Sequence, residues 1–297
     1  MSDSGAYVSI QSLAILGPGT LGLSTAQWAA ECALQVRLLG RDLEHAAKGL
    51  AEIERRWKVA VQRGQLTAQK HGEASHRLTA HAPSPESLES MDVLLEALPE
   101  SLEIKGHAWR QQKKWVPSKT LLLSGTSSLS IAAINAVAGL ENRILGFHLF
   151  VPVSRMAIVE LIHPLQTHQE WIERAKALAV VLQKRVVSVK DQPGFAASRM
   201  ALALSLEAMR LVEAEVTSPE EIDALMVLGY GHPVGPLELS DRVGLDLRYA
   251  IATELERSTG DPRFAPPDIF RHKVMRGEWG RKKGQGFYAW DSQGRRR

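Results

Sequence analysis

The sequence contains a single cysteine, no long run of apolar residues and no dense run of charges of one sign. Because Cys32 stands alone, an internal disulfide framework and a Cys-X-X-Cys metal site are both excluded, and no metal site is expected. No stretch reaches the ~20 consecutive apolar residues that span a bilayer. Residues 1–12 also lack the basic start and apolar core of a signal peptide. We therefore expect a soluble, cytoplasmic protein with no membrane partner.

The charge balance argues against a nucleic-acid partner. Lys and Arg number 36 against 33 Asp and Glu, and both signs are spread along the chain. Residues 295–297 form a basic run, which we interpret as a solvated tail. With 297 residues, of which 44% are apolar, the chain is long enough for about two globular domains.

Short strand-like runs alternate with helical stretches between residues 12 and 189. Alternation of this kind predicts βαβ units, and therefore an α/β, Rossmann-type fold with a mainly parallel sheet. The strand candidates are 12–16, 36–39, 92–97, 120–124, 143–148, 158–162 and 186–189, and the helices between them include 20–32, 101–115, 128–138 and 168–182.

Two regions depart from this alternation. Residues 42–90 contain no convincing strand and predict two amphipathic helices joined near Gly64, which would project from the sheet as an arm. After residue 190 the pattern becomes helical, with helices expected at 193–215, 218–228, 235–258 and 267–276. We therefore predict an α/β domain over 1–190 and an all-α C-terminal domain over 191–297.

The stretch SLAILGPGTLG at 12–22 contains the pattern Gly-X-Gly-X-X-Gly. The pattern alone is weak, but its place between a strand and a helix favours a dinucleotide site over a structural turn. Gly17 permits the tight turn, Gly19 the approach of a pyrophosphate, and Gly22 close helix packing. The helix N-terminus offers free N–H groups to phosphate. The predicted cofactor-binding residues of this loop are Gly17, Gly19, Thr20, Leu21 and Gly22.

The end of the second predicted strand bears on the choice between NAD and NADP. A carboxylate there would bind the ribose 2′-hydroxyl of NAD, but the sequence reads Gly40-Arg41-Asp42. Gly40 occupies the acidic position, and the guanidinium of Arg41 beside it suits the 2′-phosphate of NADP. A shift of two residues would bring Asp42 to the ribose. The sequence therefore favours NADP and leaves NAD open.

His148 ends one predicted strand and Glu160 lies in the next. Most of the 10 histidines are expected to be solvated or core residues, but one at the carboxyl end of a parallel strand faces the ligand crevice. The apolar strand AIVELI rarely buries a carboxylate without a partner, so we expect Glu160 to bind His148. The carboxylate would fix the imidazole tautomer and leave the other ring nitrogen to take a proton, as alcohol oxidation requires.

Several segments together make the chain resemble the L-3-hydroxyacyl-CoA dehydrogenase family, particularly its bacterial 3-hydroxybutyryl-CoA branch. They run nearly from end to end and are far more specific than the glycine loop alone. These segments are GPGTLG (17–22), LLEALPE (94–100), GTSSLSI (125–131), GFHLFVPVSRMAIVEL (146–161), DQPGF–SR (191–199), GHPVGPLELSDRVGLD (231–246) and GRKKGQGFYAW (280–290).

The resemblance implies roles for particular residues. It makes His148 the general base or acid, Glu160 the residue that orients it, and Ser127 the serine that contacts the substrate hydroxyl. It also places Glu96 near the cofactor. It further implies an acyl-thioester substrate, a nicotinamide cofactor and a homodimer formed through the helical C-terminal domain.

Four positions depart from the family's pattern. Gly125, Val151 and Ser198 stand where the family usually has asparagine, and Gly40 stands where it has an acidic residue. Valine has no polar atom to replace a buried amide, whose loss costs about 1–3 kcal/mol. The shorter side chain of Ser198 can still donate one hydrogen bond, so we keep it as a catalytic and substrate-binding candidate.

The helical arm holds the acyl-CoA in the family, and its basic residues are thinned in this chain. We predict Arg63 as a substrate-binding residue, although a solvated helix face is the default interpretation of any one of these charges. Trp57 could stack on an adenine or cover its neighbouring helix, and the sequence leaves both open.

The leading hypothesis is an oxidoreductase that interconverts a 3-hydroxyacyl thioester and its 3-oxoacyl form, with short-chain 3-hydroxyacyl-CoA favoured. The altered positions leave open a substrate bound to acyl carrier protein, or a free hydroxy acid. A rival of another class is a catalytically inactive dinucleotide-binding or structural protein. Retention of His148, Glu160 and Ser127 at the family's spacing argues against this rival.

Overall fold

The computed structural model describes residues 9–297. Residues 1–8, which make up most of the stretch where no signal peptide is expected, lie outside this part. The chain divides after Gln192 into two compact units, of which the first contains the sheet and the second begins at Pro193.

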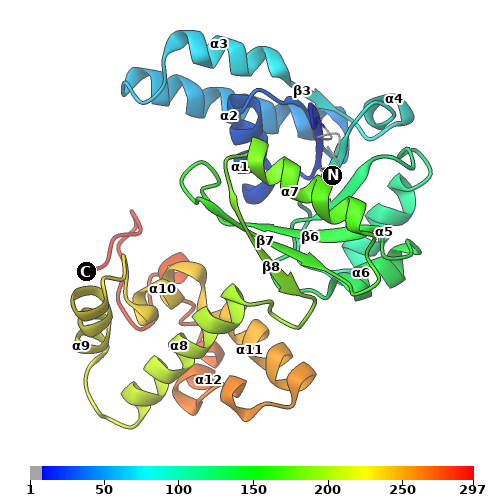
Figure 1. Cartoon of the computed structure of the whole chain (residues 1–297). Coiled ribbons are helices and arrows are strands. Elements are labelled where there is room, and N and C mark those ends of the chain that lie inside the picture. The colour runs from blue at the N-terminus through cyan, green and yellow to red at the C-terminus, as the bar shows by residue number, and fades with distance from the viewer. Residues whose placement is uncertain (1–8) are drawn as a thin grey trace, which may run out of the picture. The chain divides into compact units, whose positions relative to one another are not determined.

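The first unit is built on one eight-stranded sheet (Figure 1). Its order is β3-β2-β1-β4-β5-β6-β7-β8, and all neighbouring strands are parallel except β6 and β7. Every residue of β4 and β5 is buried, which explains their nearly continuous apolar runs. The predicted α/β fold with a mainly parallel sheet is confirmed. The strands are β1 (Ser12–Leu16), β2 (Gln35–Leu39), β3 (Leu78–His81), β4 (Val93–Glu96), β5 (Leu121–Ser124), β6 (Ile144–Leu149), β7 (Ile158–His163) and β8 (Arg185–Lys190).

Helices connect these strands, and two of them form the predicted arm. α2 (Leu43–Gln62) and α3 (Ala68–Arg77) lie side by side (Figure 1), and the chain turns between them at Gly64, where φ is +67°. The remaining helices of this unit are α1 (Thr20–Glu31), α4 (Pro85–Leu88), α5 (Leu102–Gln112), α6 (Ile131–Ala138) and α7 (Gln169–Val181).

The prediction that residues 42–90 contain no strand is wrong, because β3 and the short helix α4 lie within this range. β3 is an edge strand of four residues, LTAH, in which only Leu78 is buried. A strand this short, with one buried side chain, carries almost no alternating apolar pattern.

The second unit is helical, as predicted. Its helices are α8 (Ala197–Glu213), α9 (Pro219–Ala224), α10 (Pro236–Val243), α11 (Leu245–Thr259) and α12 (Asp268–Met275), and a π-helical turn (Leu225–Gly229) follows α9. The single helix expected at 235–258 is wrong: Gly244, with φ of +109°, separates α10 from α11. The first helix begins at Ala197, because the chain turns through Gly194 and Phe195, which both have positive φ.

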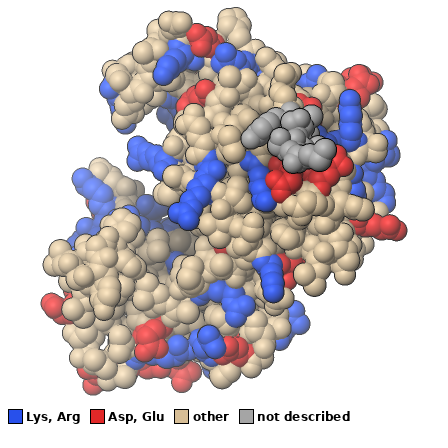
Figure 2. Space-filling view, viewed as in Figure 1, with Lys and Arg blue, Asp and Glu red and all other residues tan. Residues whose placement is uncertain are grey.

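The surface and the lone thiol show no unusual chemistry. Figure 2 shows Lys and Arg scattered among Asp and Glu over the visible face. None of the helices within residues 9–297 has the length and apolar character needed to cross a membrane. The same residues contain no group of three or more His, Cys, Asp or Glu side chains that could hold a metal ion.

Burial raises the pKa of the half-buried Cys32 thiol to about 11, so it stays protonated at neutral pH.

Candidate active site

The glycine loop leaves β1 and enters α1 with geometry that only glycine permits at two positions. Gly17 has φ of +111°, and a Cβ there would lie 2.8 Å from the carbonyl oxygen of Ala97. A Cβ on Gly22 would overlap the carbonyl oxygen of Gly17, so the helix can pack this closely only without a side chain. At Gly19, by contrast, the nearest neighbouring atom would be 4.0 Å away.

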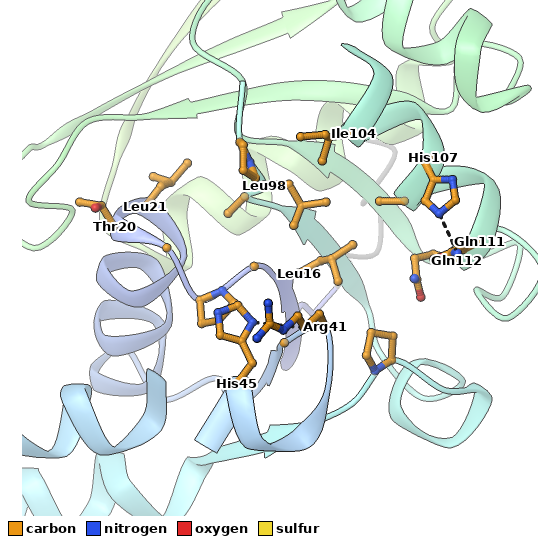
Figure 3. Close-up of a pocket in the computed structure, with 18 of the residues that line it drawn as sticks. Leu16, Thr20, Leu21, Arg41, His45, Leu98, Ile104, His107, Gln111 and Gln112 are labelled. Carbon is orange, nitrogen blue, oxygen red and sulfur yellow. Dashed lines mark hydrogen bonds between the residues drawn. The ribbon is translucent and has the colours of Figure 1, made fainter. Parts of the chain in front are cut away.

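A cavity of about 730 Å³ lies beside this loop. Figure 3 shows Thr20 and Leu21 on one side of it, and Ile104, His107 and Gln111 of α5 on the other. The first turn of α1 carries no acidic residue, so its N–H groups and positive dipole end face no competing negative charge. Six of the eight predicted cofactor residues line the cavity: Gly17, Gly19, Thr20, Leu21, Gly40 and Arg41.

The turn after β2 explains why an acidic residue is missing at position 40. A Cβ on Gly40 would lie 2.5 Å from the backbone nitrogen of Ala46, because the chain folds tightly against the start of α2. Asp42 caps this helix: its Oδ1 accepts from the N–H of His45 at 2.7 Å, which lowers the pKa of the Asp42 carboxyl. The side chain of Arg41 is 82% exposed, with its Nε 3.2 Å from Asp42 Oδ2.

Glu96, the last residue of β4, is fully buried and does not line the cavity. Its Oε1 accepts from Lys105 Nζ at 2.7 Å and from the N–H of Leu98 at 2.6 Å, and its Oε2 accepts from Ser124 Oγ at 2.6 Å. Glu96 therefore supports the chain that follows β4, and its oxygens are occupied inside the protein.

His148 and Glu160 meet across β6 and β7. The two strands are antiparallel and their register places the residues opposite each other. His148 Nδ1 lies 2.7 Å from Glu160 Oε2, and the side chains are 11% and 3% exposed. The ring of Phe150 lies 4.6 Å from the imidazole, centroid to centroid. The predicted contact between His148 and Glu160 is therefore present.

Ser127 lies in the turn that follows β5, where it contacts a residue that the sequence reasoning missed. Oε1 of Glu100 accepts from the N–H of Ser127 at 2.9 Å and lies 3.2 Å from its hydroxyl oxygen. Glu100 is the first acidic residue after β4, in the short connection to α5, four residues beyond Glu96. Its position at the carboxyl end of a parallel strand is the signal that could have identified it.

The remaining predicted residues lie apart from this pair in the chain. Ser198 is in the first turn of α8, in the second unit, and Arg63 is the exposed residue that ends α2. The roles of both stay predictions. Val151 is 44% exposed after β6, and a Cβ on Gly125 would lie 2.6 Å from the tip of Leu21.

Trp57 has no part in nucleotide stacking. Its side chain is fully buried, and Nε1 donates to Glu31 Oε1 of α1 at 2.6 Å. Of the two alternatives left open by the sequence, covering a neighbouring helix is the one that the structure shows.

Two protein-family models together match nearly the whole chain. The model described as "3-hydroxyacyl-CoA dehydrogenase, NAD binding domain" matches residues 12–192. The model described as "3-hydroxyacyl-CoA dehydrogenase, C-terminal domain" matches residues 194–290.

Individual relatives agree with the family models. The chain is 33% identical to a probable 3-hydroxybutyryl-CoA dehydrogenase of Bacillus subtilis, over 96% of this chain and 99% of the relative. It is 34% identical to a 3-hydroxyadipyl-CoA dehydrogenase of Escherichia coli over 96% of its own length, and spans 60% of that protein. The crystal structure of (S)-3-hydroxybutyryl-CoA dehydrogenase from Ralstonia eutropha superposes with a TM-score of 0.91, at 34% identity, covering 96% of this chain and 100% of that one.

Proposed function

The chain belongs to the 3-hydroxyacyl-CoA dehydrogenase family, and we propose that His148 performs its acid–base chemistry on a short-chain 3-hydroxyacyl-CoA. The protein is thus a nicotinamide-dependent oxidoreductase. In the forward direction the substrate loses a hydride from C3 and a proton from the C3 hydroxyl, giving the 3-oxoacyl thioester.

The observation that carries this proposal is the 2.7 Å contact between His148 Nδ1 and Glu160 Oε2. The buried carboxylate accepts the Nδ1–H, so the imidazole tautomer carries its lone pair on Nε2, the atom that would take the hydroxyl proton. It also stabilises the imidazolium that results, in surroundings where water is largely excluded. In the reductive direction the same imidazolium returns the proton to the 3-oxo oxygen.

The cavity beside the glycine loop suits a dinucleotide. Open space at Gly19 allows a pyrophosphate to approach the backbone, and the N-terminus of α1 supplies N–H donors. When bound, the nicotinamide supplies the hydride acceptor in oxidation and the hydride donor in reduction. The chain's own contribution is to hold the phosphates through the loop and to keep His148 oriented.

NADP is the cofactor that we propose in preference to NAD. The space at residue 40 admits no carboxylate-bearing side chain, and the Asp42 carboxylate is engaged at the start of α2. Arg41 lines the cavity with an exposed guanidinium, and the ring of His45 lies beside it in Figure 3. A guanidinium binds a phosphate more strongly than a ribose hydroxyl, which favours the 2′-phosphate.

The substrate proposal extends the family placement to particular groups. Ser127 would donate to the C3 oxygen, Ser198 would contribute one further hydrogen bond, and Arg63 at the end of the arm would contact the CoA phosphates. The Asn-to-Val change at 151 and the Asn-to-Ser change at 198 leave an acyl-carrier-protein thioester or a free hydroxy acid as the alternative substrates. A non-catalytic role is disfavoured, because a buried His–Glu pair is retained.

A homodimer formed through the second unit is also proposed. Large apolar side chains there are exposed, among them Leu228 at 85% and Tyr230 at 78%. Exposed apolar groups of this size mark interaction surfaces in many proteins. The cytoplasmic location likewise stays a prediction.

Steady-state reduction of 3-oxoacyl substrates tests the proposed function. Acetoacetyl-CoA, acetoacetyl-acyl carrier protein and free acetoacetate are each offered with NADPH and with NADH, and nicotinamide absorbance is followed. We expect the highest kcat/KM for acetoacetyl-CoA with NADPH. Preference for either alternative substrate would replace the proposed carrier, and nucleotide binding without turnover of any 3-oxoacyl compound would overturn the proposal.

A further inference from the structure

Glu100 holds the whole turn that carries Ser127. Its Oε1 accepts from the backbone N–H groups of Ser127 and Ser128, each at 2.9 Å. The hydroxyl oxygens of Thr126, Ser127 and Ser128 lie 2.7, 3.2 and 3.0 Å from the same oxygen. Two successive N–H groups converging on one anionic oxygen form a nest, and the anion in this nest belongs to the protein itself.

A buried ion network lies behind this turn. Lys105 is 1% exposed, and its Nζ lies 2.7 Å from Glu96 Oε1 and 3.5 Å from Glu100 Oε2. Burial by itself would raise the pKa of Glu100, but the Lys105 ammonium and the hydrogen bonds from the turn lower that pKa overall. Glu100 is therefore a carboxylate throughout the neutral range, with acceptor oxygens and no proton to donate.

The network adds side-chain contacts between the ends of β4 and β5, which already pair in the sheet. Glu96 ends β4 and accepts from Ser124 Oγ, the last residue of β5. Glu100, four residues further on, accepts from the turn that follows β5. Lys105, in α5, contacts both carboxylates. The position of the Ser127 backbone is therefore set by charged groups from the β4–α5 connection.

We propose that Glu100 is a positioning residue: its carboxylate, backed by Lys105, holds the 126–128 turn so that the Ser127 hydroxyl meets the substrate oxygen. This inference rests on the proposed function, because it needs Ser127 to contact substrate. A displacement of about 1 Å at such a group can reduce the rate about 100-fold. Neutralising Glu100 leaves two N–H groups and several hydroxyls competing for an uncharged oxygen, which loosens the turn.

A double-mutant cycle distinguishes this role from a general contribution to stability. Glu100→Gln, Ser127→Ala and the double variant are compared with wild type for kcat and KM with acetoacetyl-CoA. We expect Glu100→Gln to lower kcat roughly 10- to 100-fold, with KM changed less than about threefold. In the Ser127→Ala background the Glu100→Gln change should lower kcat by less than about twofold, because Glu100 acts through Ser127.

Two further variants keep the test decisive. Glu103→Gln removes one exposed carboxylate from the first turn of α5, three residues after Glu100, and should leave kcat unchanged. Glu100→Asp keeps the charge but retracts it by one methylene, and should also lower kcat. It replaces Glu100→Gln in the test if thermal unfolding shows that Glu100→Gln does not fold. Wild-type kcat in both Glu100 variants, or equal losses from Glu100→Gln with and without Ser127, would overturn the inference. Absence of turnover in wild type would instead overturn the proposed function itself.

Discussion

His148 and Glu160 face each other across the one antiparallel strand pair of the sheet in residues 9–297, with Nδ1 and Oε2 2.7 Å apart. β6 belongs to the parallel set, and β7 returns beside it in the opposite direction. The register that results places a carboxylate with 3% exposure against the ring nitrogen. The antiparallel return is therefore what orients the imidazole.

Glu160→Gln should lower kcat by about 10²- to 10⁴-fold, because an amide in place of the carboxylate no longer stabilises the imidazolium or fixes its tautomer. Nucleotide affinity should be unchanged, since Glu160 does not line the cavity. Steady-state kinetics and nucleotide titration by fluorescence check both points. Glu170→Gln, an exposed change in the first turn of α7, is the matched control. Equal activity of the two variants would contradict the role given to Glu160.

Two glycine substitutions in the loop should behave differently. Gly22→Ala places a Cβ on the carbonyl oxygen of Gly17, so we expect a loss of about 3 kcal/mol in the free energy of unfolding. Gly19→Ala meets no atom closer than 4.0 Å and should cost at most about 1 kcal/mol, while weakening nucleotide binding by crowding the pyrophosphate. Chemical denaturation and nucleotide titration measure the two effects. The reverse order of stabilities would show that the loop packs differently.

Arg41→Ala should separate the two nicotinamide cofactors. Loss of a guanidinium–phosphate contact raises the Kd for NADPH by about tenfold or more, and should leave the Kd for NADH nearly unchanged. Lys48→Ala, which removes one exposed positive charge from α2, controls for net charge. If Arg41→Ala weakens both cofactors equally, or if wild type prefers NADH, the NADP proposal fails.

The pH dependence of stability should reveal the ionised state of Glu100. Because its pKa is lower in the folded protein than the ordinary value of 4.5, its carboxylate contributes stability that is fully present above pH 4.5. That contribution is lost as the pH falls below 4.5 and through the folded pKa. The difference in unfolding free energy between wild type and Glu100→Gln should therefore be constant from pH 6 to 8 and shrink only in acid. A difference that grows toward low pH would contradict this sign.

Much of the fold could be predicted from the sequence because its signals are local. The apolar runs of β1, β4 and β5 and the glycine loop directly encode buried parallel strands and a phosphate-binding turn. β3 escaped detection because LTAH buries a single side chain at the sheet edge. The break at Gly244 was missed because a glycine within a helical pattern is often tolerated.

The site was predictable where one residue type has one plausible partner, as with His148 and Glu160. It was not predictable where one acidic residue ends a strand and another lies four residues further on. Glu96 is occupied by Lys105 and Ser124, whereas Glu100 reaches the Ser127 turn, and only the course of the chain after β4 distinguishes them. The reason for glycine at position 40 is likewise tertiary, because a Cβ there would overlap the backbone of α2 at Ala46.

The most direct test of the account is the kcat of His148→Gln in the reduction of acetoacetyl-CoA, measured at saturating NADPH. Glutamine approximates the size of the imidazole but cannot exchange the proton, so kcat should fall at least about 100-fold with the Kd for NADPH unchanged. A kcat within about threefold of wild type would show that another group exchanges the proton, and would contradict the central claim.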